Sequence, residues 1–164
     1  FCEDNFWPLV RDELSLPYAF PTKGHFQVLR GGSGVTGRLV GGNFGTIQPL
    51  IGTRWEPEWR GSILFVEEFF ARLSRTDQIL AHFRLAGVFD QIRGLIVGKP
   101  EQIEPEAESL EEIILRNCAG YKFPIITDVL VGHTDDKLTV PIGCRVRLDP
   151  AGHCLELLES PTAG

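Results

Sequence analysis

The clearest pattern along the chain is a short apolar run that ends in two carboxylates, Ile-Leu-Phe-Val-Glu-Glu at residues 63–68. Its first four positions are all apolar, which predicts a strand buried on both faces of a sheet. Because side chains alternate along a strand, Glu67 shares a face with Ile63 and Phe65, whereas Glu68 faces the other way. An acid at this end of a strand can hold a histidine, bind a metal or cap the next helix, and a solvated helix start is the ordinary alternative.

Apolar periodicity predicts further strands and helices after this central run. Two more short apolar runs have the length of buried strands, and each follows a helical pattern with its own start and stop signals. The expected strands cover residues 95–98 and 123–129. One helix is expected to begin at Ser74, with Asp77 as its capping-box acid, and to end at Gly87. A second is expected to run from a capping box at Ser109 and Glu112 through Cys118 and to be closed by Gly120. This alternation predicts a β-α-β-α-β centre with short crossovers.

The two flanks of the chain have a different pattern. Residues 25–29 alternate weakly, as in a strand, and run into a glycine loop. Near the other end, alternating runs over residues 138–140, 145–148 and 154–158 predict strands, the last two joined by the turn signal Asp149-Pro-Ala-Gly152. We therefore predict an α/β fold whose mixed sheet combines short β-α-β units with antiparallel flanks.

A glycine pair precedes the central run. Residues 37–40 predict a short strand, Gly41-Gly42 a tight turn, and Asn43 the N-cap of a short helix that extends to about Leu50. Glycines between a strand and a helix can bind phosphate, but neither of the common phosphate-loop patterns is present. Close packing of the backbone is therefore the favoured interpretation of the glycines.

Composition narrows the class of protein. The chain has 164 residues, 43% of them hydrophobic, which is enough for one domain with its own core. A formal net charge of −6 argues against a nucleic-acid partner, and no apolar run approaches the roughly 18 residues of a membrane span. The four cysteines show no C-x-x-C spacing, which argues against zinc and against a dense disulfide framework and favours a reduced, cytoplasmic protein.

The amino-terminal segment looks different from the rest. The chain begins at Phe1 and contains no methionine, so we interpret it as an excised domain, a proteolytic fragment or one half of a divided protein. Three X-Pro pairs, the first of them Trp7-Pro8, disfavour helix. We expect residues 1–22 to be an irregular linker from a missing amino-terminal domain, with its aromatic side chains packed on a surface, and residues 23–164 to form the domain itself.

A histidine follows the third predicted strand, in Val131-Gly-His-Thr-Asp-Asp136. His133 is expected at the same edge of the sheet as Glu67, where a hydrogen bond between them would give a base and its orienting carboxylate. No serine of the chain has the context of a nucleophile elbow, and Cys118 and Cys144 are expected in the core. A metal site built from His133, Asp135 and Asp136 and a purely structural His–Glu pair remain open alternatives.

An ordered series of motifs resembles one known family. It consists of Gly37-x-Leu-x-Gly-Gly-Asn43, Gly52-Thr53, Ile63-Leu-Phe-Val-Glu-Glu68, Gly87-Val-Phe, Gly94-Leu-Ile-Val-Gly98, Gly132-His133-Thr and Leu138-Thr-Val-Pro-Ile-Gly143. The series resembles the carboxy-terminal domain of the LD-carboxypeptidase family of serine peptidases. The opening run Lys23-Gly-His-Phe-Gln-Val-Leu-Arg-Gly-Gly32 is more similar to the microcin C immunity branch than to the peptidoglycan-recycling enzymes.

The resemblance implies a function for the predicted pair. It implies a swivelling β/β/α domain that closes against a flavodoxin-like domain bearing the serine nucleophile, and hydrolysis of an amide bond at the carboxyl end of a short peptide. Glu67 and His133 fall on the glutamate and histidine of the family's Ser-Glu-His triad. His133 would be the general base and Glu67 its orienting partner. The chain alone would lack the nucleophile and be inactive.

Further expectations concern ligands and partners. The family's immunity branch stacks an aromatic residue on adenine, and Trp7 and Trp55 are the candidates here; the substrate is a muropeptide or a microcin-like peptide-nucleotide. No cofactor or metal is implied. Family members are dimers, and we expect self-association through loop aromatics. These are Trp55, Trp59, Phe69 and Phe70. The alternative function is a non-catalytic module that binds a peptide or peptide-nucleotide.

Overall fold

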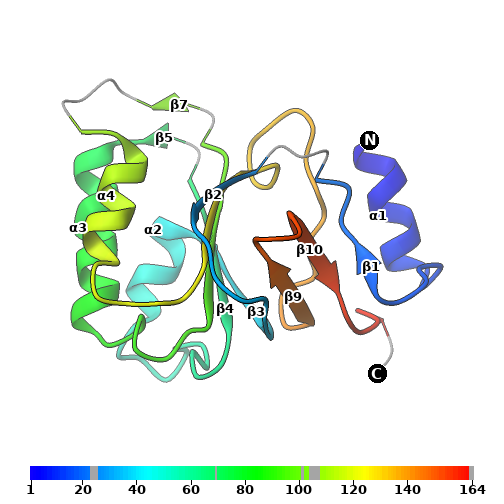
Figure 1. Ribbon diagram of the computed structural model, residues 1–164, viewed down its shortest axis with the longest axis horizontal. Coiled ribbons are helices and arrows are strands. Elements are labelled where there is room, and N and C mark those ends of the chain that lie inside the picture. The colour runs from blue at the N-terminus through cyan, green and yellow to red at the C-terminus, as the bar shows by residue number, and fades with distance from the viewer. Residues whose placement is uncertain (23–25, 69, 101, 104–107, 163–164) are drawn as a thin grey trace.

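The structure, a computed structural model, describes residues 1–22, 26–68, 70–100, 102–103 and 108–162, with the backbone alone at residues 70–71 and 102–103. Its described strands form an eight-stranded sheet in the order β1-β10-β9-β3-β4-β6-β8-β2 (Figure 1). The strands of this sheet are β1 (Tyr18–Ala19), β2 (Gln27–Arg30), β3 (Val35–Asn43), β4 (Ile63–Glu67), β6 (Gly94–Gly98), β8 (Ile125–Val129), β9 (Arg145–Asp149) and β10 (Cys154–Leu157).

The helices are mostly short, and all but the first connect the central strands. They are α1 (Cys2–Val10), α2 (Phe44–Ile47), the 3₁₀ turn η1 (Gln48–Leu50), α3 (Leu73–Leu85) and α4 (Leu110–Asn117). A separate pair of two-residue strands, β5 (Phe70–Ala71) and β7 (Gln102–Ile103), lies beyond the central sheet. No helix in the described part of the chain has both the length and the apolar character needed to cross a bilayer.

The strand directions confirm the predicted class. The central strands β3, β4, β6 and β8 are parallel neighbours. On one side β9, β10 and β1 continue the sheet antiparallel, and on the other side β2 pairs antiparallel with β8. One predicted strand was wrong: residues 138–140 have no strand structure, although Leu138 is buried.

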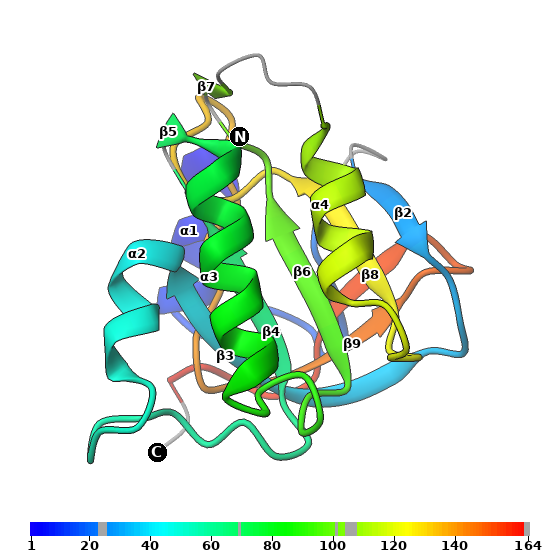
Figure 2. The same cartoon turned by 90° about the vertical axis from the view of Figure 1, so that its left-hand side faces the viewer.

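The sheet is covered on both faces. Figures 1 and 2 show α2, α3 and α4 packed against one face of β4, β6 and β8, with the β9–β10 hairpin, β1 and α1 on the opposite side. Along β4 the side chains alternate between these two cores: Leu64 and Val66 pack beneath the helices, whereas Ile63 and Phe65 pack in the second core. The predicted strand buried on both faces is confirmed.

Residues 1–22 are more ordered than predicted. The segment starts with helix α1, which contains Pro8, although proline disfavours a helix interior by about 3 kcal/mol. Tertiary contacts offset this penalty: the buried Asn5 side chain donates to the carbonyls of Phe1 and Lys137 and accepts from the backbone N–H of Thr139. The segment therefore packs on the domain.

The helix starts were predicted with mixed success. The capping box at Ser109 and Glu112 is confirmed at the start of α4. Helix α3 begins one residue before Ser74, and its N-cap makes no side-chain hydrogen bond. Asp77, expected to complete a cap there, instead accepts from Arg116 at 3.1 Å and from Asn117 at 2.7 Å. Asp77 therefore joins α3 to α4, a role that depends on tertiary contact.

The glycine pair does not form the predicted turn. Strand β3 runs straight through Gly41 and Gly42 and pairs with β4 up to Asn43. A Cβ atom on Gly41, which has a φ of 154°, would collide with the carbonyl of Phe65, so the glycine allows the two strands to approach closely. The favoured interpretation, close backbone packing, is confirmed. Asn43 caps α2 as predicted, by accepting from the N–H of Thr46.

The aromatic residues expected at a self-association surface differ in burial. Trp59 is buried, and its indole N–H donates to Glu56 at 2.7 Å, so the expectation was wrong for this residue. Trp55 is 67% exposed. Phe69 and the side chain of Phe70 lie outside the described residues. Within the segment 1–22, Phe20 is buried as expected, but Trp7 is 46% exposed.

Candidate active site

The predicted Glu67–His133 contact is present at the carboxyl edge of the parallel strands. Glu67 is the last residue of β4, and His133 lies in the loop that follows β8. The Nδ1 atom of His133 lies 3.0 Å from Oε2 of Glu67. The two strands are not neighbours, because β6 lies between them. The loop after β8 must therefore cross the end of β6 to bring the imidazole to the carboxylate.

Two glycines make this crossing possible. Gly98 ends β6, and a Cβ atom there would lie 2.9 Å from the carbonyl oxygen of Val131 and 3.0 Å from Cβ of Glu67. Gly132 has a φ of 95°, and its Cβ atom would lie 2.6 Å from Oε2 of Glu67. Real Cβ atoms essentially never come within 3.0 Å of such an atom, so a side chain at either position would displace its neighbours. The Gly-His motif therefore has a steric basis: the glycine leaves room for the carboxylate that binds the next residue.

The loop that carries His133 (residues 130–138, the histidine loop) is anchored by its own hydrogen bonds. The N–H of Leu138 donates to the carbonyl of Leu130 at 2.6 Å and closes the loop. Inside it, the buried Thr134 hydroxyl donates to the carbonyl of Asp136 at 2.7 Å. These contacts fix the backbone on both sides of His133, so the imidazole is held by the loop as well as by Glu67.

Burial divides the pair into an enclosed and an accessible partner. The Glu67 side chain is 11% exposed and the His133 side chain 50%. An enclosed carboxylate interacts more strongly with a cation, because less water screens it. The accessible imidazole can approach a group outside the domain. This geometry suits a carboxylate that orients a histidine and offsets the charge it gains on protonation.

Glu68 occupies a different environment, as strand alternation predicted. Its Oε1 accepts from the side-chain amide of Asn43 at 3.1 Å, and Asn43 is the N-cap of α2. The second carboxylate therefore lies at a helix terminus, where its negative charge is favourable. The prediction that Glu67 and not Glu68 contacts His133 is confirmed.

The alternative of a metal site finds no support in the geometry. Within the described residues, no three His, Cys, Asp or Glu side chains are grouped to hold a metal ion. Asp135 and Asp136 are exposed loop residues. The carbonyl of Asp135 lies 3.4 Å from the Cys2 thiol, which links the loop to α1.

The two cysteines expected in the core do not provide a nucleophile. Cys118 is fully buried at the end of α4, and burial raises the pKa of its thiol to about 12. Burial also raises the pKa of Cys144, which packs against the second core. The reactive form of cysteine is the thiolate, so both groups stay inert at neutral pH.

The two candidate tryptophans lie in different places. Trp7 and Phe6 line a hollow of about 250 Å³ together with Lys137 and Thr139, which continue the histidine loop. Trp55 lies in the segment that leads into the amino end of β4, at the bottom of Figure 2. Only Trp7 is therefore on the segment that contacts the histidine loop.

Replacement of Gly132 by Ala is expected to separate Glu67 from His133. The new methyl group would occupy the space of the carboxylate, and the positive φ adds backbone strain of about 1–3 kcal/mol. The imidazole ¹H–¹⁵N NMR signals of His133 should show loss of the Nδ1 hydrogen bond. Gly120→Ala is the control, because Gly120 also has positive φ but its Cβ would meet no atom within 4 Å. Unchanged imidazole signals in Gly132→Ala would contradict the steric role.

Comparisons with known proteins agree with this fold. A family model described as the LD-carboxypeptidase C-terminal domain matches residues 36–148. Microcin C7 self-immunity protein MccF of Escherichia coli is 30% identical over 122 residues, which cover 72% of this chain and 36% of that protein. A protein of Bacillus subtilis named "Probable murein peptide carboxypeptidase" is 26% identical over 119 residues, 70% of this chain and 37% of that protein.

Solved structures give the same result. MccF in its inactive mutant apo state superimposes with a TM-score of 0.77 and 26% identity, over 83% of this chain and 41% of that chain. The chain thus spans less than half the length of these relatives. The matched region contains β4, the histidine loop and the strands between them. The chain belongs to the LD-carboxypeptidase family and corresponds to the C-terminal domain of that family.

Proposed function

We propose that this domain supplies the general base and the orienting carboxylate of a serine carboxypeptidase whose nucleophile lies on another domain. The observation that carries the proposal is the 3.0 Å contact between His133 Nδ1 and Glu67 Oε2 at the carboxyl edge of the sheet. Ligands in open α/β sheets bind at this edge. The half-exposed imidazole is positioned to meet a group that approaches from outside the domain.

The geometry supports different roles for Glu67 and His133 in this reaction. In this proposal Nδ1–H of His133 donates a hydrogen bond to Oε2 of Glu67. Nε2 is then the nitrogen that takes the proton of the serine hydroxyl as the oxygen attacks the amide carbonyl. The enclosed carboxylate stabilises the imidazolium that forms. The imidazolium then gives its proton to the leaving amine nitrogen as the C–N bond breaks. Water hydrolyses the acyl ester by the same proton transfers, and the serine is regenerated.

The proposed substrate is a short peptide cleaved at its carboxy-terminal amide bond. Two substrate classes follow from the relatives' names: an LD-peptide of muropeptides and a microcin-like peptide-nucleotide. MccF structures contain glutamyl sulfamoyl guanosine and aspartyl sulfamoyl adenosine, which join an acidic aminoacyl group to a nucleoside. This similarity supports the peptide-nucleotide class for the present chain.

Trp7 is the better placed of the two tryptophans to contact such a substrate. It is half-exposed, lines a hollow with Lys137, and has the Arg11 guanidinium 5.1 Å from its ring centroid. An exposed indole offers a face on which a nucleobase can stack. Trp55 is far more exposed and lies in the segment between η1 and the amino end of β4, so we assign it to a proposed homodimer contact rather than to substrate.

We further propose that residues 1–22 connect this domain to the nucleophile-bearing domain. Helix α1 lies against the histidine loop through Asn5, which contacts Lys137 and Thr139. A domain that continued from Phe1 would therefore start close to the proposed substrate hollow. This arrangement would bring the two domains together on the side of His133.

The isolated chain is expected to hydrolyse no peptide, because a base and its orienting group act only on a positioned nucleophile. Release of the carboxy-terminal amino acid from a model peptide would be measured with the chain alone and after addition of the nucleophile-bearing domain of its own protein. Turnover that requires both components supports the proposal. Tight peptide binding by the chain with no turnover in the combined sample would favour the non-catalytic binding module.

A further inference from the structure

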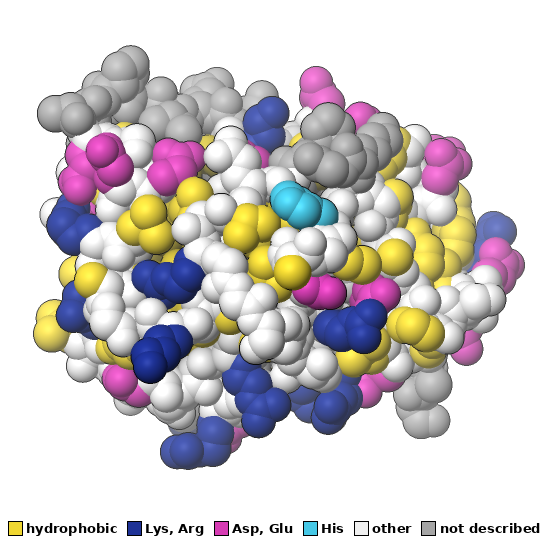
Figure 3. Space-filling view, viewed as in Figure 1, with side chains coloured by type: hydrophobic (Ala, Val, Ile, Leu, Met, Phe, Trp, Pro, Cys, Tyr) yellow, Lys and Arg dark blue, Asp and Glu magenta, His cyan; other side chains and the backbone are white. Residues whose placement is uncertain are grey.

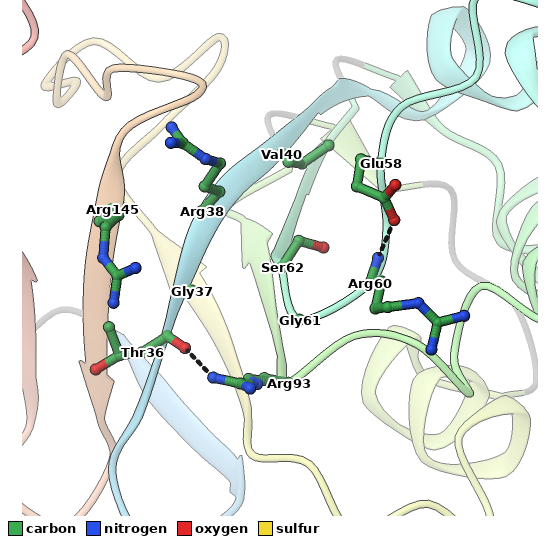
Figure 4. A pocket seen from close by; sticks show the side chains of 10 residues that line it. All are labelled: Thr36, Gly37, Arg38, Val40, Glu58, Arg60, Gly61, Ser62, Arg93 and Arg145. Carbon is green, nitrogen blue, oxygen red and sulfur yellow. Dashed lines mark hydrogen bonds between the residues drawn. The ribbon is translucent and has the colours of Figure 1, made fainter.

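A second hollow lies at the opposite edge of the sheet, where the parallel strands begin. It has a volume of about 380 Å³, at the lower end of the roughly 300–1,000 Å³ typical of ligand pockets. Four of its lining residues are arginines and one is an acid: Arg38, Arg60, Arg93, Arg145 and Glu58 (Figure 4). The activity proposed above uses none of these residues.

The divergence of two strands creates this hollow. Strand β3 pairs with β4 only from Leu39 onward, whereas its first residues pair with β9 alone. The gap beside residues 36–38 is closed underneath by the turn at Gly61, and a Cβ atom on Gly37 would lie 2.5 Å from the Gly61 carbonyl oxygen. Because Gly37 and Gly61 have no side chains, the bottom of the hollow is formed by backbone atoms and the space above them stays open.

The arrangement concentrates positive charge. Arg38 on β3 is directly opposite Arg145 on β9 in the antiparallel register, and like charges at such positions destabilise a sheet. Arg93 is held near them, because its Nη1 donates to the carbonyl of Thr36 at 3.2 Å. In Figure 4 the side chains of Arg145 and Arg93 extend toward Thr36, whereas Arg38 and Arg60 extend outward from the rim.

Few carboxylates compensate these charges. Glu159 lies 3.6 Å from Arg38, and Glu58 accepts from the backbone N–H of Arg60. Over the described residues, no carboxylate lies within ion-pair distance of the Arg60, Arg93 or Arg145 guanidinium groups. Figure 3 shows basic side chains gathered in the lower half of this face of the molecule, although the whole chain has a net charge of −6. The local excess of guanidinium groups is therefore a feature of this hollow and not of the composition.

We propose that this hollow binds a small anion with a divalent phosphate group, held mainly by Arg93 and Arg145. A planar guanidinium donates two parallel hydrogen bonds to a phosphate, and two such groups match its double negative charge. The site lies at the other end of the strands from Glu67 and His133. The proposal of anion binding therefore does not depend on the proposed hydrolysis.

The test is a calorimetric titration of the chain at low ionic strength with inorganic phosphate and, separately, with glycerol 3-phosphate. We expect saturable binding with a Kd below about 1 mM for at least one of them. Equal affinities would mean that recognition is limited to the phosphate group, and tighter binding of the ester would mean that the adjoining organic group is also held. The affinity for glycerol 3-phosphate should increase from pH 5 to pH 7.5, because a phosphate monoester loses its second proton near pH ~6 while arginine stays charged.

The variants Arg93→Gln and Arg145→Gln should each weaken binding about tenfold. Arg145→Lys keeps the charge but loses the planar guanidinium group, so its affinity for phosphate should lie between those of the parent chain and Arg145→Gln. Arg11→Gln removes the same charge from α1, outside the pocket lining, and Glu67→Gln alters the other edge; neither should change the affinity. Absence of saturable binding by either phosphate compound, or equal weakening by Arg11→Gln, would overturn the proposal.

Discussion

Replacement of His133 by Ala is expected to lower peptide hydrolysis by about 10⁴- to 10⁶-fold in the protein assembled with its nucleophile-bearing domain. Without the imidazole, nothing takes the serine proton during attack or returns it to the leaving amine. Glu67→Gln should cost about 10²- to 10⁴-fold, because the amide has no charge to offset the imidazolium and can favour the wrong tautomer. Both losses should appear in kcat, with KM little changed.

Glu68→Gln is the matched control for Glu67→Gln. It removes the same charge from the adjacent residue, but Glu68 contacts Asn43 at the start of α2 and not His133. We expect its kcat to stay within a fewfold of the parent value. Equal losses in Glu67→Gln and Glu68→Gln would show that the general negative charge of this edge matters, and not the contact with His133. Circular dichroism of each variant would establish that the fold is intact.

Phe83→Ala is expected to lower the free energy of unfolding by about 3–5 kcal/mol. Phe83 lies on α3, is fully buried, and has the rings of Phe44, Trp59 and Phe89 6.0–6.4 Å away. The cavity would open beneath the helices that cover β4, the strand that carries Glu67. A loss of this size is a large fraction of the 5–15 kcal/mol typical of a domain.

The helix offers its own control for this substitution. Leu85→Ala lies two residues further along α3 and alters a side chain that is 87% exposed, so unfolding free energy should change by no more than about 0.5 kcal/mol. Urea unfolding monitored by circular dichroism measures both variants. A similar small change in the two would mean that the aromatic cluster around Phe83 tolerates the loss of its central ring.

Local patterns in the sequence determined the central strand and the direction of its acids. Two-residue alternation through Ile63–Glu67 is a property of any extended backbone, so it was sufficient to assign Glu67 and Glu68 to opposite faces. The capping box at Ser109 spans a single helical turn and was equally readable. The resemblance to the family led to the roles proposed for Glu67 and His133, because spacing alone left a metal site open as an alternative.

Features that depend on distant parts of the chain could not be predicted in this way. Helix α1 forms despite Pro8 because Asn5 bonds to residues more than 130 positions away. The glycines at 41 and 42 are strand residues because β4 lies against them, and no local signal records that neighbour.

The tertiary structure alone also decided how the candidate sites are assembled. Strand order places β6 between β4, which ends at Glu67, and β8, which precedes His133. The loop after β8 must therefore cross over Gly98 and pack Gly132 against the Glu67 carboxylate. The same strand pairing sets Arg38 opposite Arg145, although 107 positions separate them in the chain. Sequence specifies local backbone geometry and the face on which each side chain lies. Which faces meet depends on the packing of the whole sheet, because one strand order must satisfy every backbone hydrogen bond and both cores together.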